Sequence, residues 1–315
     1  MSKTAFVFPG QGSQTVGMMK EFYDTYPVVK DLFKEADDAL GFSLTNLIFQ
    51  GPEEDLKLTA NTQPAILTCS IAAYKVMQEK GLKADVAAGH SLGEYSALVA
   101  AEAISFSDAV KTVRKRGQFM QEAVPVGEGA MAAIIALATE KIEEICAKVT
   151  KEVGQPVQPV NFNCPGQIVI AGATKAVEQA CTELKEAGAK RAIMLPVSAP
   201  FHSVLMQPAA DKLAVELEKV TFHDAKIPVY ANVTAKPETS AAEIKQLLVK
   251  QAASPVLWQH TVENMIADGV KNFVEVGPGK VLTGFVKKIN RDFVGQNVED
   301  QASLEKTIAY LQEVR

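Results

Sequence analysis

A serine flanked by two glycines lies between a predicted strand and a predicted helix, and this arrangement limits the fold more than any other part of the chain. Residues 86–89 form a short apolar run, Gly89, Ser91 and Gly93 follow as G-x-S-x-G, and residues 94–100 favour a helix. The glycines permit a tight bend without a Cβ clash, so the serine hydroxyl projects outward. The helix N-terminus directs backbone N–H groups at any oxyanion formed there. The pattern alone is weak, and its place between strand and helix gives it weight.

Strand and helix patterns alternate through most of the chain. Strands are predicted near residues 4–8, 86–89, 227–230 and 272–276, and helices within 16–39 and over 64–80 and 107–123. Further helices begin near residues 204 and 241, and two helices close the chain. Because parallel neighbours need a crossover connection, this alternation predicts an α/β fold with a parallel sheet at its core.

The middle of the chain has a different order of elements. Between residues 127 and 196 the patterns predict strand 130–137, helix 139–148, strands 157–162 and 167–172, helix 174–187 and strand 191–195. This βαββαβ order is typical of a ferredoxin-like domain, and prolines and glycines flank it on both sides. We therefore expect a small domain over residues 128–197, inserted into a large domain over residues 1–127 and 198–315.

Composition excludes several classes of partner. The chain has 315 residues and a net charge of −5, so no global field draws it to nucleic acid or anionic lipid. The longest apolar run, residues 130–138, is too short to cross a bilayer, and the N-terminus does not resemble a signal peptide. Cys69, Cys146, Cys164 and Cys181 are widely spaced and lie mostly in apolar patterns, which is typical of reduced thiols. These features predict a cytoplasmic protein with neither a nucleic-acid nor a membrane partner.

A serine nucleophile needs an adjacent base, and histidine is the most frequent one. His90 adjoins Ser91, so its side chain would diverge from the serine at a sharp bend. His223 lies in a polar turn, and His260 lies near a helix start, where packing or capping explains it. His202 lies in a proline-stiffened loop that leads from the small domain back to the large one, where clefts form. Residue chemistry alone does not decide between His202 and the other three histidines as the base.

Two glycine-containing loops follow predicted strands and precede helices. The loop at residues 8–14 has Gly10 and Gly12, but Thr15 stands where a dinucleotide fingerprint needs a third glycine. Its backbone can instead supply one N–H of an oxyanion hole, with the N–H of Leu92 as the other. The loop at residues 275–281 lacks the spacing of a phosphate-binding loop, and we interpret it as a tight turn.

The predicted helix over residues 107–123 carries four cations. Such a cluster is usually a solvated helix face. Arg114 and Arg116 flank the apolar stripe of this helix on opposite edges, so helical periodicity does not show which one turns inward. Whichever does can bind a carboxylate with two parallel hydrogen bonds.

Five segments resemble malonyl-CoA:acyl carrier protein transacylases, and they occur in that family's order. They are residues 10–14 (GQGSQ), 89–97 (GHSLGEYSA), 114–118 (RKRGQ), 200–203 (PFHS) and 275–279 (EVGPG). One such segment is weak, whereas five in order, covering the chain to about residue 290, are specific. The resemblance implies an α/β-hydrolase-like large domain with the inserted ferredoxin-like domain.

The resemblance also implies roles for individual residues in a ping-pong transfer. Ser91 would attack the malonyl thioester, and His202 would accept its proton and later deprotonate the phosphopantetheine thiol. The backbone N–H groups of Gln11 and Leu92 would hold the oxyanion. Arg116 matches the arginine that pairs with the free carboxylate of malonate. The backbone carbonyl of Gln251 would orient the histidine in place of an acid.

The expected partners are malonyl-CoA and acyl carrier protein, with no metal and no cofactor of the enzyme's own. Carrier proteins of this family are usually strongly acidic, so docking needs a local basic patch. The candidate patch consists of Lys280, Lys287, Lys288 and Arg291, and its alternative is an ordinary group of cations at a helix C-terminus.

Three other functions remain as alternatives. A hydrolase or thioesterase shares the serine elbow, but its histidine normally lies near the C-terminus, whereas a long segment follows His202 here. A non-catalytic scaffold would tolerate loss of Ser91 or His202, and both are present. A stand-alone loading acyltransferase for polyketide synthesis uses the same residues, and the sequence does not separate it from a role in fatty acid synthesis.

Overall fold

The computed structural model describes residues 2–197 and 199–314 of the chain. Its larger sheet contains β1 (Lys3–Phe8), β2 (Val86–Gly89), β7 (Val229–Tyr230), β8 (Pro237–Glu238), β9 (Val270–Val276) and β10 (Gln296–Val298). The strand order is β10-β9-β1-β2-β7-β8, and the neighbours pair in parallel except β7 and β8. The predicted parallel core is therefore confirmed.

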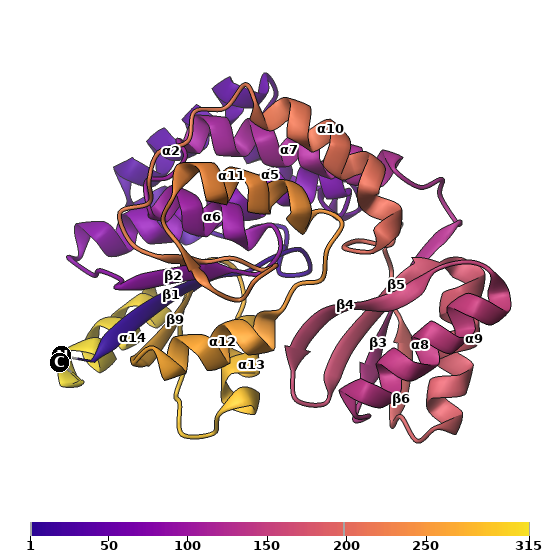
Figure 1. Cartoon of the computed structure of the whole chain (residues 1–315). Helices are drawn as coiled ribbons and strands as arrows, with labels where there is room; N and C mark the ends of the chain where they lie inside the picture. Colours follow the sequence, from indigo (N-terminus) through magenta and orange to yellow (C-terminus); the bar gives the residue numbers. More distant parts are fainter. Residues whose placement is uncertain (1, 198, 315) are drawn as a thin grey trace.

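Helices cover both faces of this sheet. They are α1 (Lys20–Thr25), α2 (Pro27–Leu40), α3 (Leu44–Gln50), α4 (Glu53–Leu56), α5 (Thr59–Glu79), α6 (Gly93–Ala100), α7 (Phe106–Glu122), α10 (Gln207–Leu217), α11 (Ala241–Gln251), α12 (Trp258–Ala267), α13 (Val281–Ile289) and α14 (Gln301–Glu313). Figure 1 shows α5, α6 and α7 above the sheet and α12 and α13 below it. Side chains of β1 alternate between these layers, with Phe6 and Phe8 in one core and Ala5 and Val7 in the other.

Helix α5 begins five residues before the predicted start at Pro64. Proline is favoured in the first turn of a helix because it has no N–H to donate, which makes Pro64 resemble a start. In the structure it lies inside α5, and the carbonyl of Ala60 that its N–H would have bonded accepts a hydrogen bond from Nη1 of Arg114 instead, at 3.1 Å. The extra turn is therefore stabilised from another helix.

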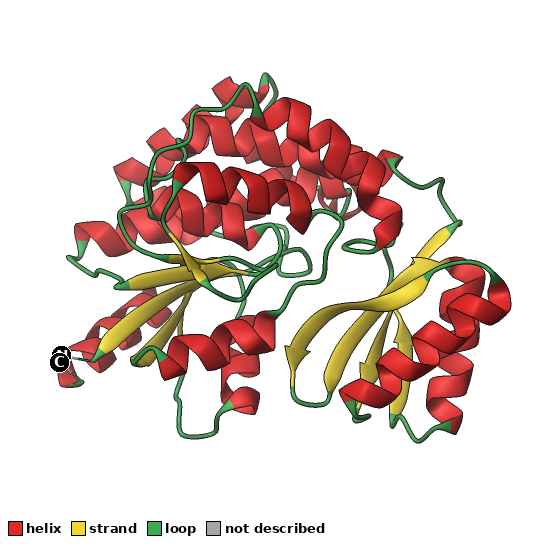
Figure 2. Cartoon of the chain, viewed as in Figure 1, coloured by secondary structure: helices red, strands yellow, loops and turns green. Residues whose placement is uncertain are grey.

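The second sheet is antiparallel and lies beside the first (Figure 2). Its elements are β3 (Gly129–Ile135), α8 (Thr139–Val153), β4 (Val157–Cys164), β5 (Gln167–Ala173), α9 (Thr174–Glu186) and β6 (Arg191–Met194), in strand order β4-β5-β3-β6. This is the predicted order of elements, with shifts of up to five residues at their ends. Helices α8 and α9 pack on one face of the sheet and enclose a core of its own.

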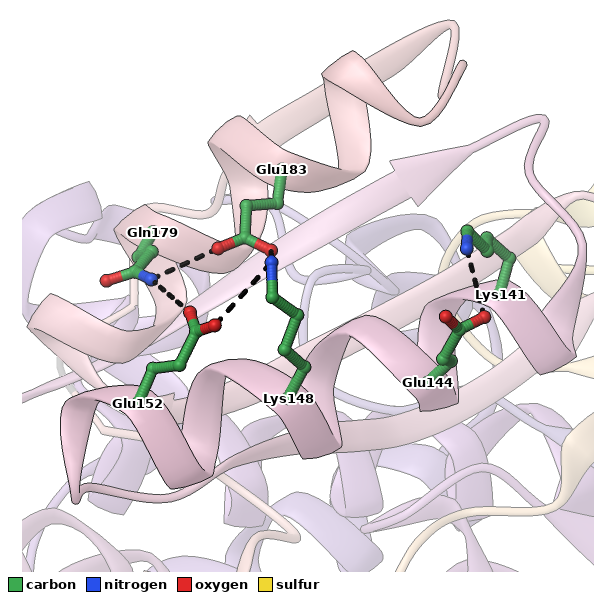
Figure 3. A network of polar contacts seen from close by, with 6 residues as sticks. All are labelled: Lys141, Glu144, Lys148, Glu152, Gln179 and Glu183. Atoms are coloured by element: carbon green, nitrogen blue, oxygen red, sulfur yellow. Dashed lines mark hydrogen bonds and ion pairs between the residues drawn. The ribbon is translucent and has the colours of Figure 1, made fainter.

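A polar network joins α8 to α9 on their exposed side (Figure 3). Lys148 pairs with Glu183 of α9 at 3.0 Å and with Glu152 of its own helix at 3.6 Å. Gln179 donates to both carboxylates at 3.1 Å. Exposed pairs of this kind contribute little to stability, so the apolar core beneath them holds the two helices.

The opposite face of the small sheet packs against the larger part of the chain. Met131 and Val169 of this face share a buried cluster with Met120 of α7 and with Phe201. Backbone hydrogen bonds add a second connection, because Val256 donates to the carbonyl of Val160 at 2.8 Å and accepts from Phe162 at 3.0 Å. The junction is thus an ordered interface on which a cleft can be built.

Some elements differ from the predictions. Strands β8 and β10 and helices α3 and α4 have no counterpart among the predicted elements, because each is short or lies in a polar stretch. The helix predicted from residue 204 begins as a 3-10 turn, Val204–Met206, and continues as α10. No helix within the described residues is long and apolar enough to cross a membrane.

Candidate active site

Ser91 lies on the bend between β2 and α6, as the glycine pattern predicts. Its φ of 52° is in the left-handed region, which is uncommon for a residue with a Cβ. A Cβ at Gly89 would collide with the backbone of Gly93, and one at Gly93 would collide with the carbonyl oxygen of Phe8. Only glycine fits on either side of the serine, so this bend depends directly on the sequence.

His202 is the histidine that the fold brings to Ser91. Its Nε2 lies 2.7 Å from Oγ of Ser91, and its Nδ1 lies 2.8 Å from the backbone oxygen of Gln251. The carbonyl can only accept, so Nδ1 carries the hydrogen and Nε2 is free to accept the serine proton. Burial and the positive charge of Arg116 lower the pKa of His202 to about 3. The imidazole is therefore neutral near pH 7, as a base must be.

Arg116 turns into the site and Arg114 does not, which resolves the choice that helical periodicity left open. Arg116 is 1% exposed, and its Nη2 donates to Oγ of Ser91 at 3.2 Å and to Oε1 of Gln251 at 2.9 Å. Its Nη1 donates to Gln63 at 2.8 Å. Arg114 instead bonds the start of α5 and stacks on Phe42, with 4.4 Å between its guanidinium carbon and the ring centroid.

Arg116 has one further buried hydrogen-bond donor, its Nε. Its Nε has no hydrogen-bond partner among residues 2–197 and 199–314. A buried N–H without an acceptor costs about 1–3 kcal/mol, so a bound group with acceptor oxygens would stabilise this side chain. The guanidinium is consequently suited to a carboxylate.

The predicted oxyanion hole uses two backbone amides, and it stays a prediction. Leu92 lies at the N-terminus of α6, and Gln11 lies in the loop after β1. Within the described part of the chain neither N–H has an acceptor among the protein hydrogen bonds. Both donors therefore remain available to an oxygen that a substrate brings.

A cavity of about 120 Å³ lies beside the serine and is lined from both parts of the chain. Ser91, His202 and Arg116 line it from the large part, and Met131 and Leu195 line it from the small part. A second cavity of about 280 Å³ adjoins it through shared lining residues and extends to α13. The site thus lies at the junction of the two parts of the chain.

Among the described residues, none of the other three histidines is hydrogen-bonded to the serine hydroxyl. His90 points to Asn163, with 2.8 Å between Nε2 and Oδ1, and its ring packs against Trp258. His223 is exposed. His260 is exposed and contacts the ring of Phe162.

The residues of the predicted docking patch are all exposed, but they do not form one cluster. Lys280 precedes the first turn of α13, whereas Lys287 and Lys288 lie in its last turn and Arg291 follows it. At about 1.5 Å of rise per residue, Lys287 and Lys288 lie about 10–12 Å from Lys280 along the helix axis.

Sequence reasoning missed three polar residues that contact this site, namely Gln63, Glu94 and Asn232. Asn232 accepts the N–H of Ser91 at 2.7 Å, and Glu94 accepts from Gln251 at 2.9 Å. Glu94 directly follows the glycine pattern, so an acid in the first turn of a buried helix was a usable signal. Gln63 and Asn232 are polar residues in otherwise ordinary segments, and only the fold brings Gln63 to Arg116 and Asn232 to Ser91.

Comparison with known proteins identifies the family. Residues 5–309 match the acyl transferase domain. The chain belongs to the acyl transferase domain family. It is 55% identical to a malonyl CoA-acyl carrier protein transacylase of Bacillus subtilis over 99% of this chain and 98% of that protein. The corresponding protein of Escherichia coli K12 is 57% identical over 92% of this chain and 93% of its own length.

Solved structures agree with this assignment. A crystal structure of an acyl carrier protein S-malonyltransferase from Vibrio cholerae superposes with a TM-score of 0.95 at 52% identity, covering 97% of this chain and 100% of that one. A malonyl-transacylase solved in complex with a type II PKS acyl-carrier protein also has a TM-score of 0.95, at 51% identity, covering 98% and 100%. The acyl transferase fold is therefore established over nearly the whole chain.

Proposed function

We propose that this chain transfers the malonyl group of malonyl-CoA to the phosphopantetheine thiol of acyl carrier protein, and so supplies malonyl units for fatty acid biosynthesis. The position of the Ser91 hydroxyl carries this proposal, because it lies 2.7 Å from Nε2 of His202 and 3.2 Å from Nη2 of Arg116. A nucleophile, a neutral base and a buried cation thus meet in one cavity. The names and high identity of the relatives support the same reaction.

In the first half-reaction, Oγ of Ser91 attacks the thioester carbonyl while Nε2 of His202 takes the hydroxyl proton. The amides of Gln11 and Leu92 donate to the oxyanion as it forms. The carbon–sulfur bond then breaks, the proton on His202 passes to the departing CoA thiolate, and a malonyl ester remains on Ser91. The Gln251 carbonyl stabilises the transient imidazolium through Nδ1–H and fills the place of a triad acid.

In the second half-reaction, the carrier protein thiol gives its proton to His202 and attacks the ester carbonyl. The ester bond to Oγ breaks, and Ser91 regains its proton. The cavity of about 280 Å³ beside the serine can hold the thiol-bearing arm. The arm belongs to the carrier protein, so this reaction requires no cofactor and no metal of the enzyme's own.

Arg116 determines which acyl group is used. The free carboxylate of a malonyl group can accept from Nε and from an Nη of this guanidinium, two parallel bonds that an acetyl group cannot make. The Nε without a partner supports this role. Binding at both ends also holds the acyl ester in place until the thiol arrives.

Acyl carrier protein docks by charge at the mouth of the cleft. Lys287, Lys288 and Arg291 group at the end of α13, and Lys280 lies at its start, beside the larger cavity. Both groups are exposed, and complementary charge mainly accelerates encounter with an acidic partner. We assign the protein to the cytoplasm, where such carriers and reduced cysteines occur together.

Polyketide loading remains the second candidate function. A relative of 51% identity was solved with a type II PKS acyl-carrier protein, so this fold serves that pathway in at least one protein. The chemistry at Ser91 is the same in both pathways, and only the identity of the carrier protein differs.

We also propose a finer description of the fold. The order β4-β5-β3-β6 with two helices on one face supports a ferredoxin-like small domain over residues 128–197. The parallel sheet with the serine elbow supports an α/β-hydrolase-like large domain over residues 1–127 and 198–315. Residues 1, 198 and 315 of these bounds lie outside the described part of the chain.

The deciding experiment uses malonyl-CoA without carrier protein. Intact-protein mass spectrometry is expected to show one malonyl adduct, which peptide mapping assigns to Ser91. Ser91→Ala should show none, whereas Ser96→Ala, at a buried serine in the helix α6 that follows the bend, should keep it. A wild-type enzyme without an adduct, or a Ser91→Ala variant that retains one, would rule out the acyl-serine mechanism.

A further inference from the structure

The strained backbone of Ser91 is held by two distant side chains. Its N–H donates to Oδ1 of Asn232 at 2.7 Å, and its carbonyl accepts from Nε2 of Gln251 at 2.8 Å. Asn232 also donates from its side chain to the carbonyl of Gly89 at 2.7 Å. Hydrogen bonds from residues far away in the sequence therefore hold the bend, in addition to its glycines.

Both of these residues converge on one carboxylate oxygen. The backbone N–H of Asn232 donates to Oε2 of Glu94 at 3.0 Å, and Nε2 of Gln251 donates to the same oxygen at 2.9 Å. Glu94 is 3% exposed and lies in the first turn of α6, three residues after the serine. Burying a carboxylate costs free energy unless hydrogen-bond donors such as these surround it. The two donors therefore offset part of the desolvation cost of Glu94.

The carboxylate also determines which way the Gln251 amide points. Since Nε2 is directed to Glu94 and to the Ser91 carbonyl, Oε1 faces Arg116 and accepts from Nη2 at 2.9 Å. The backbone oxygen of the same glutamine accepts from Nδ1 of His202. One residue thus contacts the nucleophile, the base and the cation, and Glu94 fixes its orientation.

We propose that Glu94 is a positioning residue for acyl transfer, and that its ionised carboxylate orients Gln251 and Asn232 and thereby Ser91 and Arg116. It touches no reacting atom and acts through these two amides. The inference rests on the acyl-serine mechanism above. It adds a residue whose charge, rather than its shape alone, sets the geometry of the site.

Ionisation of Glu94 gives this role a measurable signature. Burial raises the pKa of its carboxyl to about 7, against the opposing effects of the Asn232 and Gln251 hydrogen bonds and the charge of Arg116. The charged or titratable groups acting around it are Arg116 of α7 and Tyr95 of its own helix, whereas α11 and the segment after β7 contribute neutral amides. Glu94 gains a proton as pH falls through 7. His202 stays neutral down to about pH 3, so an acid limb near pH 7 reports Glu94.

The test is the second-order rate constant, kcat/KM, for malonyl loading on Ser91, which reports the pKa values of the enzyme before malonyl-CoA binds and so excludes a change in the pKa of His202 on binding. It is measured by rapid-quench mass spectrometry between about pH 5 and 9, a range that brackets the pKa of Glu94. We expect the wild-type rate to fall below pH 7. Glu94→Gln, a neutral isostere, should load about tenfold more slowly at pH 8 and show no acid limb, because charge-assisted hydrogen bonds are about twice as strong as neutral ones. In effect the variant should behave at every pH like the protonated wild-type enzyme.

Glu275→Gln is the matched control, because Glu275 is also a buried carboxylate and accepts the N–H groups of Leu282 and Thr283 at the start of α13. It should keep the wild-type acid limb. Asn232→Ala provides a second variant and should load more slowly while keeping the limb, since Glu94 is still present. If Glu94→Gln folds poorly, loss of the limb in Asn232→Ala or its absence from the wild type would still overturn the inference.

The outcomes separate this inference from the proposed function. A wild-type enzyme that forms no malonyl ester refutes the acyl-serine mechanism. A wild-type enzyme that loads normally, together with a Glu94→Gln variant of equal rate and identical pH profile, refutes the role of Glu94 alone.

Discussion

Arg116→Ala tests the selectivity of the site most directly. The substitution removes a guanidinium that is 1% exposed and that we assign to the malonyl carboxylate. Breaking a buried charge pair by removing one partner costs about 3–5 kcal/mol. At about 1.4 kcal/mol per tenfold change in rate, kcat/KM for malonyl-CoA should fall by about two to three and a half orders of magnitude.

The comparison with acetyl-CoA isolates the carboxylate contribution. Arg116→Ala also leaves Oε1 of Gln63 and Oε1 of Gln251 without their donor, at about 1–3 kcal/mol each, but this loss is common to both substrates. The ratio of the two kcat/KM values cancels the common loss. We expect that ratio to move toward acetyl-CoA by about a hundredfold or more, measured as transfer to carrier protein for each thioester.

Arg114→Ala is the matched control on the same helix. It removes the hydrogen bond to Ala60 and the stacking on Phe42, so it should destabilise the protein by about 1–2 kcal/mol and leave the substrate ratio unchanged. An unchanged ratio in Arg116→Ala would refute the carboxylate assignment. A collapsed ratio in Arg114→Ala would transfer it to the neighbouring arginine.

Two further predictions concern the bend and the docking patch. Gly93→Ala should lower the free energy of unfolding by more than about 2 kcal/mol in urea titrations, because its Cβ would collide with the Phe8 backbone, whereas Gly284→Ala, with open space around it in α13, should raise it by about 0.5–1 kcal/mol. Replacing Lys287, Lys288 and Arg291 together by Glu should raise KM for carrier protein and flatten its salt dependence without slowing malonyl loading. Unaltered carrier kinetics in that variant would place the docking surface elsewhere.

The elements of the fold follow from local patterns more faithfully than their ends do. The serine bend is predictable because the serine and the two glycines that permit the bend lie within five consecutive residues. The start of α5 is not, because a donor from α7 replaces the N–H that Pro64 lacks. Strand β10 has three residues, and its pairing with β9 depends on the whole sheet. Long-range partners of this kind leave no local trace in a sequence.

The same distinction applies to the site. Ser91 follows from its motif, and His202 is one of four histidines until the fold places it 2.7 Å from the serine. The choice between Arg114 and Arg116 depends on which edge of α7 faces Ser91 and Gln251, which periodicity does not specify. Gln251 is pointed to only by family resemblance, since its backbone oxygen could belong to any residue type. Asn232 lies 141 positions from the serine whose N–H it accepts.

The closeness of Arg116 to His202 connects selectivity to basicity. The guanidinium charge is one of the causes that lower the pKa of the imidazole, after burial. A malonyl carboxylate bound to Arg116 neutralises that charge, so the pKa of His202 rises when the correct acyl group is present. A base whose pKa moves toward the working pH transfers protons more effectively. An acetyl group has no carboxylate to neutralise the charge of Arg116, so the pKa of His202 stays low and the imidazole is a weaker base. In the proposed reaction Arg116 would therefore favour malonyl transfer in two ways, by binding the carboxylate and by raising the pKa of the base that activates Ser91.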